Sequence, residues 1–489
     1  MSDDTARTAP QAPRTQPRPR RSGEREPRLR EVRAFTDYVA TGWAAPEVRP
    51  DLVPGTAEAA ASHRRRLSAA LPGQVLVLGS GTAPVRNDDC SYAFRPDSAF
   101  VWASGCQAED AVLVMTPTGS GHDATLYLPP PFRPGEEGFF GDALHGEMWV
   151  GASPGLPEWA EALDMEVRPR SELRGHHGLA GGLAASSVPA EENAAAGLQA
   201  SAELDRVLST LRIVKDDWEV EQLRGAVAAT VEGFAAVVAE IPRAIEEGLG
   251  ERWLQGTFDR HARTHGNGPG YSTIVGSGAH APVLHWVRCD GPVHPGSSIL
   301  LDMGVEARSL YTADVTRTIP ASGTFTSAER AVHDLVERSH RAGLAQVRPG
   351  NGYLDFHYAA MEVIAEGLHD WGLLPVSVDE ALAPTGQHHR RYLVCGIGHH
   401  LGLDVHDCSR SHWEDYKGAP LAAGMVLTVE PGLYFHAHDL TVPPELRGIG
   451  VRLEDDVLVT AEGSEVLSAA LPINAAEVEA WTRRQLGRG

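Results

Sequence analysis

Cysteine is scarce in this sequence. Only five cysteines occur among 489 residues, and no two of them stand in a CxxC spacing: Cys90, Cys106, Cys289, Cys395 and Cys408. So low a density excludes a disulfide-stapled scaffold, and the missing pair spacing excludes a zinc-finger pattern. We therefore expect the protein to work in a reducing compartment, the cytoplasm.

Long apolar runs are also missing. A membrane-spanning helix needs about 18 to 20 consecutive apolar residues, and no run of that length occurs. Arg20 and Arg21 could begin a twin-arginine export signal, but the hydrophobic stretch that must follow them is absent. We expect no membrane association.

Positive charge is in deficit. There are 43 Lys and Arg residues against 65 Asp and Glu residues, which gives a formal net charge of -22. A chain with this balance repels phosphate backbones and anionic lipid surfaces. The composition therefore excludes general nucleic-acid binding.

The length and texture of the chain predict two domains after a tail. A chain of 489 residues with 42% hydrophobic content can bury more than one core. Residues 1–35 are rich in Arg and Pro and poor in apolar side chains, so we expect a disordered tail. Over residues 36–207, apolar runs such as QVLVLGSGT and DAVLVMTP alternate with helical stretches, which predicts an α/β domain. Residues 208–489 form the second predicted domain.

Helical and strand patterns both occur in that second domain. Thr326 and Glu329 are spaced as a capping box, which predicts that a helix begins directly after Thr326. Short β-rich runs follow and intervene, among them SILLDMG, ADVTRTI, GMVLTVEPGLYF and GVRLEDDVLVT. The pattern predicts an α+β domain with helices packed over an antiparallel sheet. Apolar residues recur at steps of three and four along one long helix: Val220, Leu223, Val227, Val231, Phe234 and Val238.

Two aspartates interrupt neighbouring apolar strands. Asp302 directly follows an apolar run, and Asp314 stands inside the β-branched run around Val315. An ionised carboxylate taken out of water costs several kcal/mol unless it is paired or bound to a metal. Either these residues only line strand ends, or positive charge lies between them.

Three more residues of this kind follow in the sequence. His399 lies in GIGHHLGLDVHD, Glu430 in MVLTVEPG and Glu454 in VRLEDDV. Each alone is typical of a strand end or an ion pair. Four carboxylates and one imidazole that converge would instead suit a pair of divalent metals such as Mn²⁺ or Co²⁺.

The order of these motifs resembles a known family. GYSTIVGSGAHAPVLHW, LLDMG with ADVTRT, GIGHHLGLDVHD, VLTVEPGLY and GVRLEDD are similar, in this order, to motifs of aminopeptidase P and prolidase, the proline-directed pita-bread metallopeptidases. RNDDCSYAFRPDSAFVWASGCQAEDAVLV resembles their noncatalytic N-terminal domain. The resemblance implies a C-terminal pita-bread catalytic domain preceded by an α/β domain.

The resemblance also implies roles for the five residues. Asp302 would bind one metal, His399 and Glu430 the other, and Asp314 and Glu454 would bridge the two. A hydroxide held between the metals would attack the peptide bond. Two divalent ions per subunit are implied, with Mn²⁺ preferred and Co²⁺ or Zn²⁺ possible.

Three more residues are implied to assist. His285 and His406 match family positions that contact substrate, stabilise the tetrahedral intermediate or move protons. Arg452 lies two residues before Glu454, hence on the same side of a strand. We expect it to orient a ligating carboxylate or a neighbouring acid such as Asp404.

The sequence departs from the family at two places. Asp314 lies twelve positions after Asp302, one more than the family pattern. An extra residue inside a strand would turn every following side chain to the other face, so we place it in the EARS segment of the hairpin loop. Cys395 stands four residues before His399, where many relatives carry histidine, and we expect it to be a neutral thiol that lines the pocket.

The predicted activity is the metal-dependent release of the N-terminal residue from peptides with proline in second position, as by an Xaa-Pro aminopeptidase. The alternatives within the fold are a prolidase restricted to dipeptides, a methionine aminopeptidase or a creatinase-like amidinohydrolase, and outside catalysis a binding protein. A creatinase lacks the ligand set, and methionine aminopeptidases usually lack such an N-terminal domain. The expected partners are peptide substrates and further copies of the chain, in a homodimer or homotetramer.

Overall fold

The structure is a computed structural model that describes residues 27–487 of the chain. Contacts divide the chain into two compact units. One comprises the described residues up to Val48 together with Pro131–Gly155, and the other comprises Arg49–Pro130 and the chain from Leu156 onward. Most of the predicted tail, residues 1–35, lies outside the described residues.

The first unit is small and helical. Aromatic pairs join its two segments: the ring centroids of Phe35 and Phe140 lie 5.1 Å apart, as do those of Trp43 and Phe139. Both pairs meet edge to face, the arrangement that the ring quadrupoles favour. Its elements are η1 (Leu29–Glu31), α1 (Arg33–Val39), α4 (Gly138–Gly141) and α5 (Glu147–Val150).

The second unit begins with a mixed sheet in the order β6-β5-β4-β1-β7-β8. β4 pairs antiparallel with β1 and β5, whereas β6, β7 and β8 join in parallel. Helices flank the sheet, which agrees with the predicted α/β class. The strands are β1 (Leu76–Gly79), β4 (Val112–Pro117), β5 (His122–Leu128), β6 (Glu166–Pro169), β7 (Leu183–Ala184) and β8 (Gln199–Ala200). The helices are α2 (Thr56–Ala70), α3 (Ser98–Ser104), α6 (Leu156–Leu163), η2 (Arg170–Gly175), α7 (Ala190–Ala196) and α8 (Ala202–Leu211), and β2 (Val85–Asn87) and β3 (Cys90–Ser91) form a separate hairpin.

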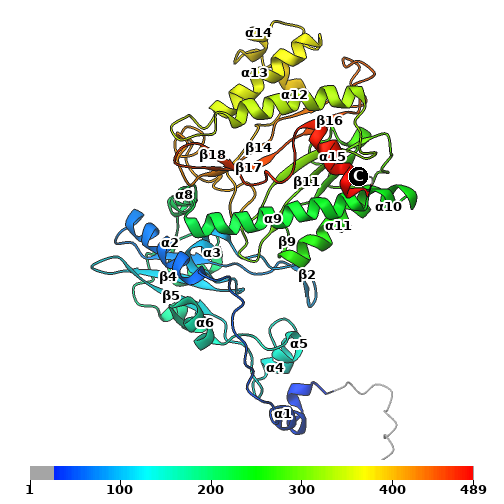
Figure 1. The fold of residues 1–489 in the computed structure, drawn as a ribbon. Helices are drawn as coiled ribbons and strands as arrows, with labels where there is room; N and C mark the ends of the chain where they lie inside the picture. Colours follow the sequence, from blue (N-terminus) through cyan, green and yellow to red (C-terminus); the bar gives the residue numbers. More distant parts are fainter. Residues whose placement is uncertain (1–26, 488–489) are drawn as a thin grey trace, which may run out of the picture. The chain divides into compact units, whose positions relative to one another are not determined.

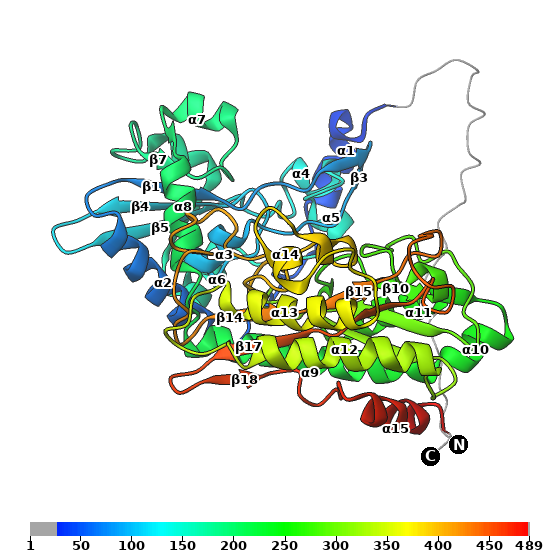
Figure 2. The same ribbon diagram turned by 90° about the horizontal axis from the view of Figure 1, so that it is seen from above.

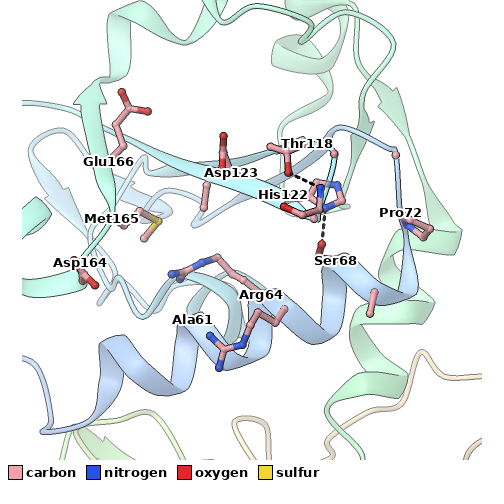
Figure 3. A pocket seen from close by; sticks show the side chains of 17 residues that line it. Ala61, Arg64, Ser68, Pro72, Thr118, His122, Asp123, Asp164, Met165 and Glu166 are labelled. Atoms are coloured by element: carbon pink, nitrogen blue, oxygen red, sulfur yellow. Dashed lines mark hydrogen bonds between the residues drawn. The ribbon is translucent and has the colours of Figure 1, made fainter.

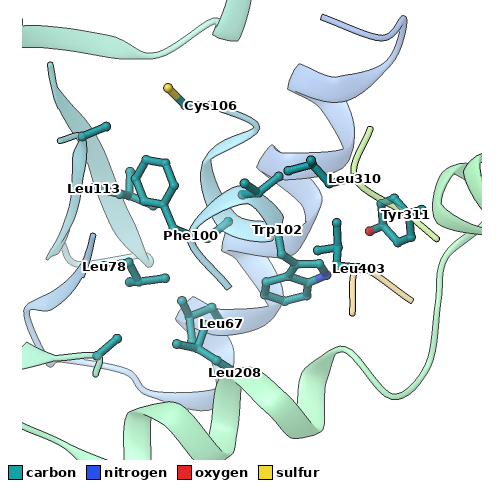
Figure 4. Packing of buried hydrophobic residues seen from close by; sticks show 14 of the residues in the cluster. Leu67, Leu78, Phe100, Trp102, Cys106, Leu113, Leu208, Leu310, Tyr311 and Leu403 are labelled. Carbon is teal, nitrogen blue, oxygen red and sulfur yellow. The ribbon is translucent and has the colours of Figure 1, made fainter. Parts of the chain in front are cut away.

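The hydrophobic core of this sheet continues into the following domain. Phe100 and Trp102 of α3 are almost fully buried, and Figure 4 shows them between the sheet and side chains that come from much later in the sequence. Those later side chains are Leu310, Tyr311 and Leu403. Burial of an apolar side chain contributes about 1.5 to 3 kcal/mol. The core therefore anchors two C-terminal loops, at residues 307–311 and 401–405, to the N-terminal sheet.

Long helices define the C-terminal part. The predicted capping box of Thr326 and Glu329 is present at the start of α12, and Asp216 and Glu219 form another at the start of α9. The apolar stripe predicted on α9 is buried except for Val231, which is partly buried. The helices are α9 (Asp217–Ala239), α10 (Ile241–Glu246), α11 (Gly250–His265), η3 (Gly278–His280), α12 (Ser327–Leu344), α13 (Asp355–Asp370), α14 (Val378–Leu382), η4 (His388–Arg391) and α15 (Ala475–Gln485).

Every strand pairing in this part is antiparallel, as predicted. The ladders are β10-β11-β13, β14-β17-β18, β15-β16 and β12-β9. In Figure 1 these strands lie between the pair α12 and α13 on one side and the pair α9 and α11 on the other, and in Figure 2, seen from above, α12 and α13 are on the near side. The strands are β9 (Gly268–Pro269), β10 (Ile274–Ser277), β11 (Ser298–Met303), β12 (Val305–Glu306), β13 (Val315–Pro320), β14 (Val426–Val429), β15 (Gly432–Tyr434), β16 (Gly450–Arg452), β17 (Asp455–Val459) and β18 (Ser464–Val466).

A buried histidine joins α2 to the start of α9. His63 donates from Nδ1 to the Trp102 carbonyl (2.8 Å) and from Nε2 to Asp216 (2.9 Å). Both acceptors require a ring proton, so the imidazole is charged. Burial by itself would lower the pKa of His63, but Asp216 and Glu219 outweigh it and raise this pKa from 6.5 to about 9.

We expect His63 to make stability depend on pH. A folded-state pKa above the unfolded value means that its contribution is fully present below about pH 6.5 and is lost as pH rises through about 9. The loss amounts to at most about 3 kcal/mol. Urea unfolding of the wild type and of His63→Gln between pH 6 and 9.5, where ~1.4 kcal/mol corresponds to one pKa unit, measures it. An equal fall in the variant would contradict this assignment.

Candidate active site

Eight side chains singled out from the sequence line one cavity of about 630 Å³ in the C-terminal part. They are the five predicted metal ligands Asp302, Asp314, His399, Glu430 and Glu454, with His285, His406 and Arg452. They come from strands and loops that span residues 285–454 of the sequence. The fold therefore brings all eight predicted site residues to one place.

Strand register explains how the acids converge. Asp302 of β11 is paired with Thr316 of β13, and Thr316 forms a bridge with Glu454. Glu430 follows β14 and lies across from Glu454 in the register that the β14-β17 and β15-β16 ladders share. Directly opposed residues of antiparallel strands point to the same face. Carboxylates from separate strand pairs thus share one face.

The hairpin that carries Asp302 and Asp314 has an unbroken register from β11 and β13 up to its loop. The longer separation of the two aspartates is therefore taken up outside the strands, in the loop Ala307–Tyr311. Leu310 in this loop has φ of 70°, an uncommon value for a residue with a branched side chain. Its side chain packs into the core shared with the N-terminal sheet, which holds the loop in place (Figure 4).

His399 lies between acids of different strands. Its Nε2 is 3.3 Å from Asp314 Oδ2 and 3.5 Å from Glu430 Oε1. The backbone of residues 397–399 bonds along β14, which sets its position. Ligand atoms of Asp314, His399 and Glu454 all lie within 4.8 Å of one another. Burial by itself would lower the pKa of His399, but Asp314 and Glu430 raise it to about 9.

The acids destabilise one another's charge. Burial, with repulsion among the acids as a further cause, raises the pKa of Glu430 to about 7 and that of Glu454 well above its usual value. Burial likewise raises the pKa of Asp302. Glu454 Oε1 is buried and has no hydrogen-bond partner among the described residues. A cluster of carboxylate oxygens with excess negative charge is suited to bind divalent cations. Such cations would relieve the repulsion among the acids and would give Glu454 Oε1 a partner.

Arg452 contacts Asp302. Its Nη2 donates to Asp302 Oδ2, its Nε donates to Thr316 Oγ1 at 3.0 Å, and its Nη1 donates to Tyr434 Oη at 3.0 Å. Of the two alternatives expected from the sequence, a ligating carboxylate or a neighbouring acid such as Asp404, the structure shows the contact with Asp302, one of the predicted ligands.

Asp404 has other partners. It accepts hydrogen bonds from Arg212 at 2.9 Å and from Ser98 at 2.6 Å, and it forms an ion pair with Arg95. These residues lie at the junction with the N-terminal sheet. Asp404 lies on a loop that faces that junction, so of the two alternatives expected for Arg452 the structure does not show the contact with Asp404.

Several polar side chains around the acids had no distinctive sequence signal. Tyr271 Oη donates to Asp302 Oδ1 at 2.6 Å, and Thr316 Oγ1 donates to Glu454 Oε2 at 2.6 Å. Burial raises the pKa of Tyr271 well above its usual value, so it remains a donor. The backbone N–H of Asp314 donates to Asp456 at 3.1 Å. Only Asp456, two residues after Glu454, had a usable signal, the period of a strand.

The rest of the cavity lining is largely apolar and includes exposed side chains. His285 and His406 are exposed there, and the His406 ring lies 4.3 Å from the His399 ring. Cys395 and Lys417 also line it. Burial and the charge of Glu430 raise the pKa of the Cys395 thiol, which keeps it neutral. The apolar lining includes Ile274, Leu284, Val287 and Val405.

A larger hollow, of about 1020 Å³, lies elsewhere, between α2, the β4–β5 turn and β6 (Figure 3). Arg64, Arg65, Asp123 and Asp164 line it, and His122 is already hydrogen-bonded to Ser68 at 2.8 Å. The lining of this hollow mixes positive and negative side chains, and its imidazole already has a hydrogen-bond partner. It therefore lacks a cluster of acids and histidines that could hold a metal. The smaller cavity is therefore the candidate active site.

Among the described helices, none combines the length and the apolar character needed to cross a membrane. Models of two protein families match the chain. Residues 221–461 match Metallopeptidase family M24, and residues 60–179 match the aminopeptidase P N-terminal domain. The two matches fall on the C-terminal part and on the N-terminal sheet.

Curated relatives match over most of their length. The chain is 48% identical to Xaa-Pro aminopeptidase 2 of Streptomyces coelicolor over 462 residues, 91% of this chain and 95% of that protein. It is 45% identical to Xaa-Pro aminopeptidase 1 of the same organism over 460 residues, 91% of each.

Solved structures match as well. A glutamate-to-alanine variant of Escherichia coli aminopeptidase P in complex with substrate matches with a TM-score of 0.77 and 27% identity, over 88% of this chain and 99% of that one. Pseudomonas aeruginosa aminopeptidase PepP matches with a TM-score of 0.76 and 28% identity, over 89% and 99%.

Proposed function

Because this chain belongs to metallopeptidase family M24, with the N-terminal domain of aminopeptidase P before a C-terminal pita-bread domain, we propose that it is an Xaa-Pro aminopeptidase. It hydrolyses, with a divalent metal, the bond between the N-terminal residue of a peptide and a proline in second position. The observation that carries this proposal is the convergence of four acids and His399 on one cavity.

We propose two metals per subunit. Asp302 would hold one, His399 and Glu430 the other, and Asp314 and Glu454 would contact both. Four oxygen donors and one imidazole favour Mn²⁺ or Co²⁺, although Zn²⁺ also accepts such a set. When bound, the metals supply Lewis acidity that activates a water molecule and polarises the peptide carbonyl.

The neighbouring side chains have separate tasks. Arg452 and Tyr271 bond the two oxygens of Asp302, so the carboxylate is held in one orientation. Thr316 does the same for one oxygen of Glu454, which leaves Oε1 for a metal. His285 and His406, which line the cavity and are exposed, would bind the peptide and move protons to and from the leaving amine.

The substrate test is a panel of peptides analysed by mass spectrometry. We expect release of the first residue from Xaa-Pro dipeptides and from longer Xaa-Pro-Xaa peptides, and no cleavage when alanine replaces the proline. Cleavage of dipeptides alone would identify a prolidase instead. The same panel with no cleavage of any member, in metal-loaded enzyme, would support a binding protein.

Variants of Cys395 test whether this cavity-lining side chain is a metal ligand or a contact for the peptide. The Cys395 thiol is neutral, and in our assignment His399 already provides the ligand from this segment. The substitution Cys395→Ser therefore removes no charge that would hold a metal. We expect this variant to keep full metal content and at least about half of kcat. Cys395→His should change KM or the preferred peptide length more than kcat. Loss of one metal equivalent in Cys395→Ser, by elemental analysis, would make Cys395 a ligand.

We also propose a cytoplasmic location and a homodimer or homotetramer. All five cysteines are free thiols, which suits a reducing compartment. The first unit exposes large apolar side chains, with 80% of Tyr38 and 60% of Trp149 accessible in the single chain. Such side chains are enriched at protein interfaces. Sedimentation analysis of the wild type gives the assembly directly.

A further inference from the structure

A second group of metal-ligating side chains lies on α9 and α11, and none of its members lines the cavity. His261 and His265 stand four residues apart on α11, and Glu232 faces them from α9. One ligand atom of each lies within 4.8 Å of the others. The two imidazole rings stack with centroids 4.2 Å apart. The helices that carry the group pack side by side (Figure 1).

The local structure fixes the position and the tautomer of one imidazole. His261 Nε2 bonds the Ala229 carbonyl of α9 at 2.8 Å, and a carbonyl only accepts, so this nitrogen carries the proton. The lone pair of Nδ1 then remains free for a metal. Metal-binding histidines almost always donate their other ring N–H to such an acceptor.

The backbone permits this close approach. Gly233 follows Glu232 on α9, and a Cβ built there would lie 3.0 Å from His261 Cδ2 and 2.7 Å from the Phe258 ring. A larger residue would therefore push α11 and its histidines away from Glu232. The absence of a side chain at Gly233 keeps the three ligands within reach of one ion.

We propose that Glu232, His261 and His265 form a binding site for a transition-metal cation, most suitably Zn²⁺, that links α9 to α11. Two histidines four residues apart on one helix face are a known zinc-ligand arrangement, and a carboxylate completes three protein ligands. Water would fill the fourth tetrahedral position, because Glu232 and His265 are exposed. Imidazole donors favour zinc over the hard cations preferred at an acid-rich site.

Two other groups of similar composition do not qualify. In the group His63, Asp216 and Glu219, both ring nitrogens of His63 donate hydrogen bonds, so neither can ligate. In the group His333, Asp334 and Glu337, Glu337 is bonded to Arg341 and Asn474. The α9–α11 group alone among these three combines a free imidazole lone pair with solvent access.

A metal at this site would stabilise the packing of the helix and strands that lie behind the active site. α11 packs against β10, and β10 pairs with β11, the strand that ends near Asp302. None of the three ligands lines the catalytic cavity. The expected consequence is thermal stabilisation by zinc without a requirement for zinc in peptide hydrolysis.

The test uses Mn²⁺-saturated enzyme titrated with Zn²⁺. After desalting, elemental analysis should find one more zinc equivalent in the wild type than in His265→Ala or Glu232→Gln. The exposed His294→Ala serves as the matched control and should bind as much zinc as the wild type. Zinc should also raise the Tm of the wild type and the control by about 2 °C or more, and that of the two variants by less.

Zinc that replaces Mn²⁺ in the catalytic cavity is common to all four proteins, so only the difference between them is informative. Anomalous scattering at the zinc edge should place a peak between α9 and α11. Equal zinc content in all four proteins, or an anomalous peak only in the catalytic cavity, would overturn the proposal. Either result would leave the assignment of the peptidase site untouched.

Discussion

Glu454→Gln is expected to lower kcat on an Xaa-Pro-Xaa peptide by about a thousandfold or more, which corresponds to roughly 4 kcal/mol of transition-state stabilisation. Asp314→Asn should have an effect of similar size. Each change keeps the shape of the side chain but removes a negative charge from the place where we propose that both metals are held. An amide oxygen binds a divalent cation more weakly than a carboxylate does, so metal content should fall as well.

The fold should survive these changes. Thr316 still has an oxygen to bond at position 454, and neither position 314 nor position 454 belongs to the apolar clusters around the cavity. Since burial and repulsion already raise the pKa of Glu454, a neutral amide relieves repulsion and should not reduce Tm in metal-free protein. Circular dichroism, Tm and elemental analysis accompany the kinetics. The exposed Asp379→Asn is the matched control and should behave as the wild type.

A Glu454→Gln enzyme with near-normal kcat and two metal equivalents would remove Glu454 from the site. The same result for Asp314→Asn would remove Asp314. Loss of activity with normal metal content would instead assign the residue to proton transfer or substrate binding. The two measurements together therefore separate the proposed ligand role from its alternatives.

Chelation is expected to abolish hydrolysis, and added Mn²⁺ or Co²⁺ should restore it better than Mg²⁺ or Ca²⁺. The reason is that the ligand set combines carboxylates with an imidazole, which Mg²⁺ and Ca²⁺ rarely use. Activity should fall by at least about a thousandfold, because without metal the attacking water is not activated, and the Cys395 thiol is neutral and therefore a weak nucleophile. Calorimetry should also show a lower Tm after chelation, since the metal binds only the folded protein.

The chelation experiment needs a metal-content assay and a control for inhibition by the chelator itself. Dialysis against buffer without chelator removes the chelator, so that it cannot itself inhibit the enzyme. Elemental analysis of the dialysed protein then measures the metal content. Undiminished hydrolysis in protein verified to contain no metal would refute a metal-dependent mechanism. Restoration that saturates at one equivalent would retain the metal requirement but contradict the proposed pair.

Much of the site could be predicted because its residues sit in local patterns. Asp302 lies in an apolar strand, Glu430 directly follows another and Glu454 lies between two more, and an acid at such a position needs a positive partner. The order of the motifs then indicated the family, and the α+β class and the antiparallel pairing followed from the periodicities of helix and strand. The capping box at Thr326 likewise depends only on neighbours three residues apart.

Partners far apart in the sequence were harder to predict. Arg452 was placed on the right face by the period of a strand, but its bond to Asp302 depends on the register of separate ladders. Tyr271 and Thr316 carry no local signal, because tyrosine and threonine are common in strands whatever they bond. Leu310 looks like an ordinary loop residue, and only the shared core explains why it anchors the hairpin that holds the two aspartates.

The sequence by itself thus determined which buried carboxylates need a positive partner for their charge, which segments favour helix or strand, and which metals the donor set favours. These properties depend on residue type and short-range spacing. Tertiary structure alone decided that Asp404 bonds Arg212 while Arg452 bonds Asp302, and that Glu232 meets His261 across two helices. Such contacts join residues between 29 and 192 positions apart. Their formation depends on strand register and helix packing, which arise from the whole core and leave no local pattern in the chain.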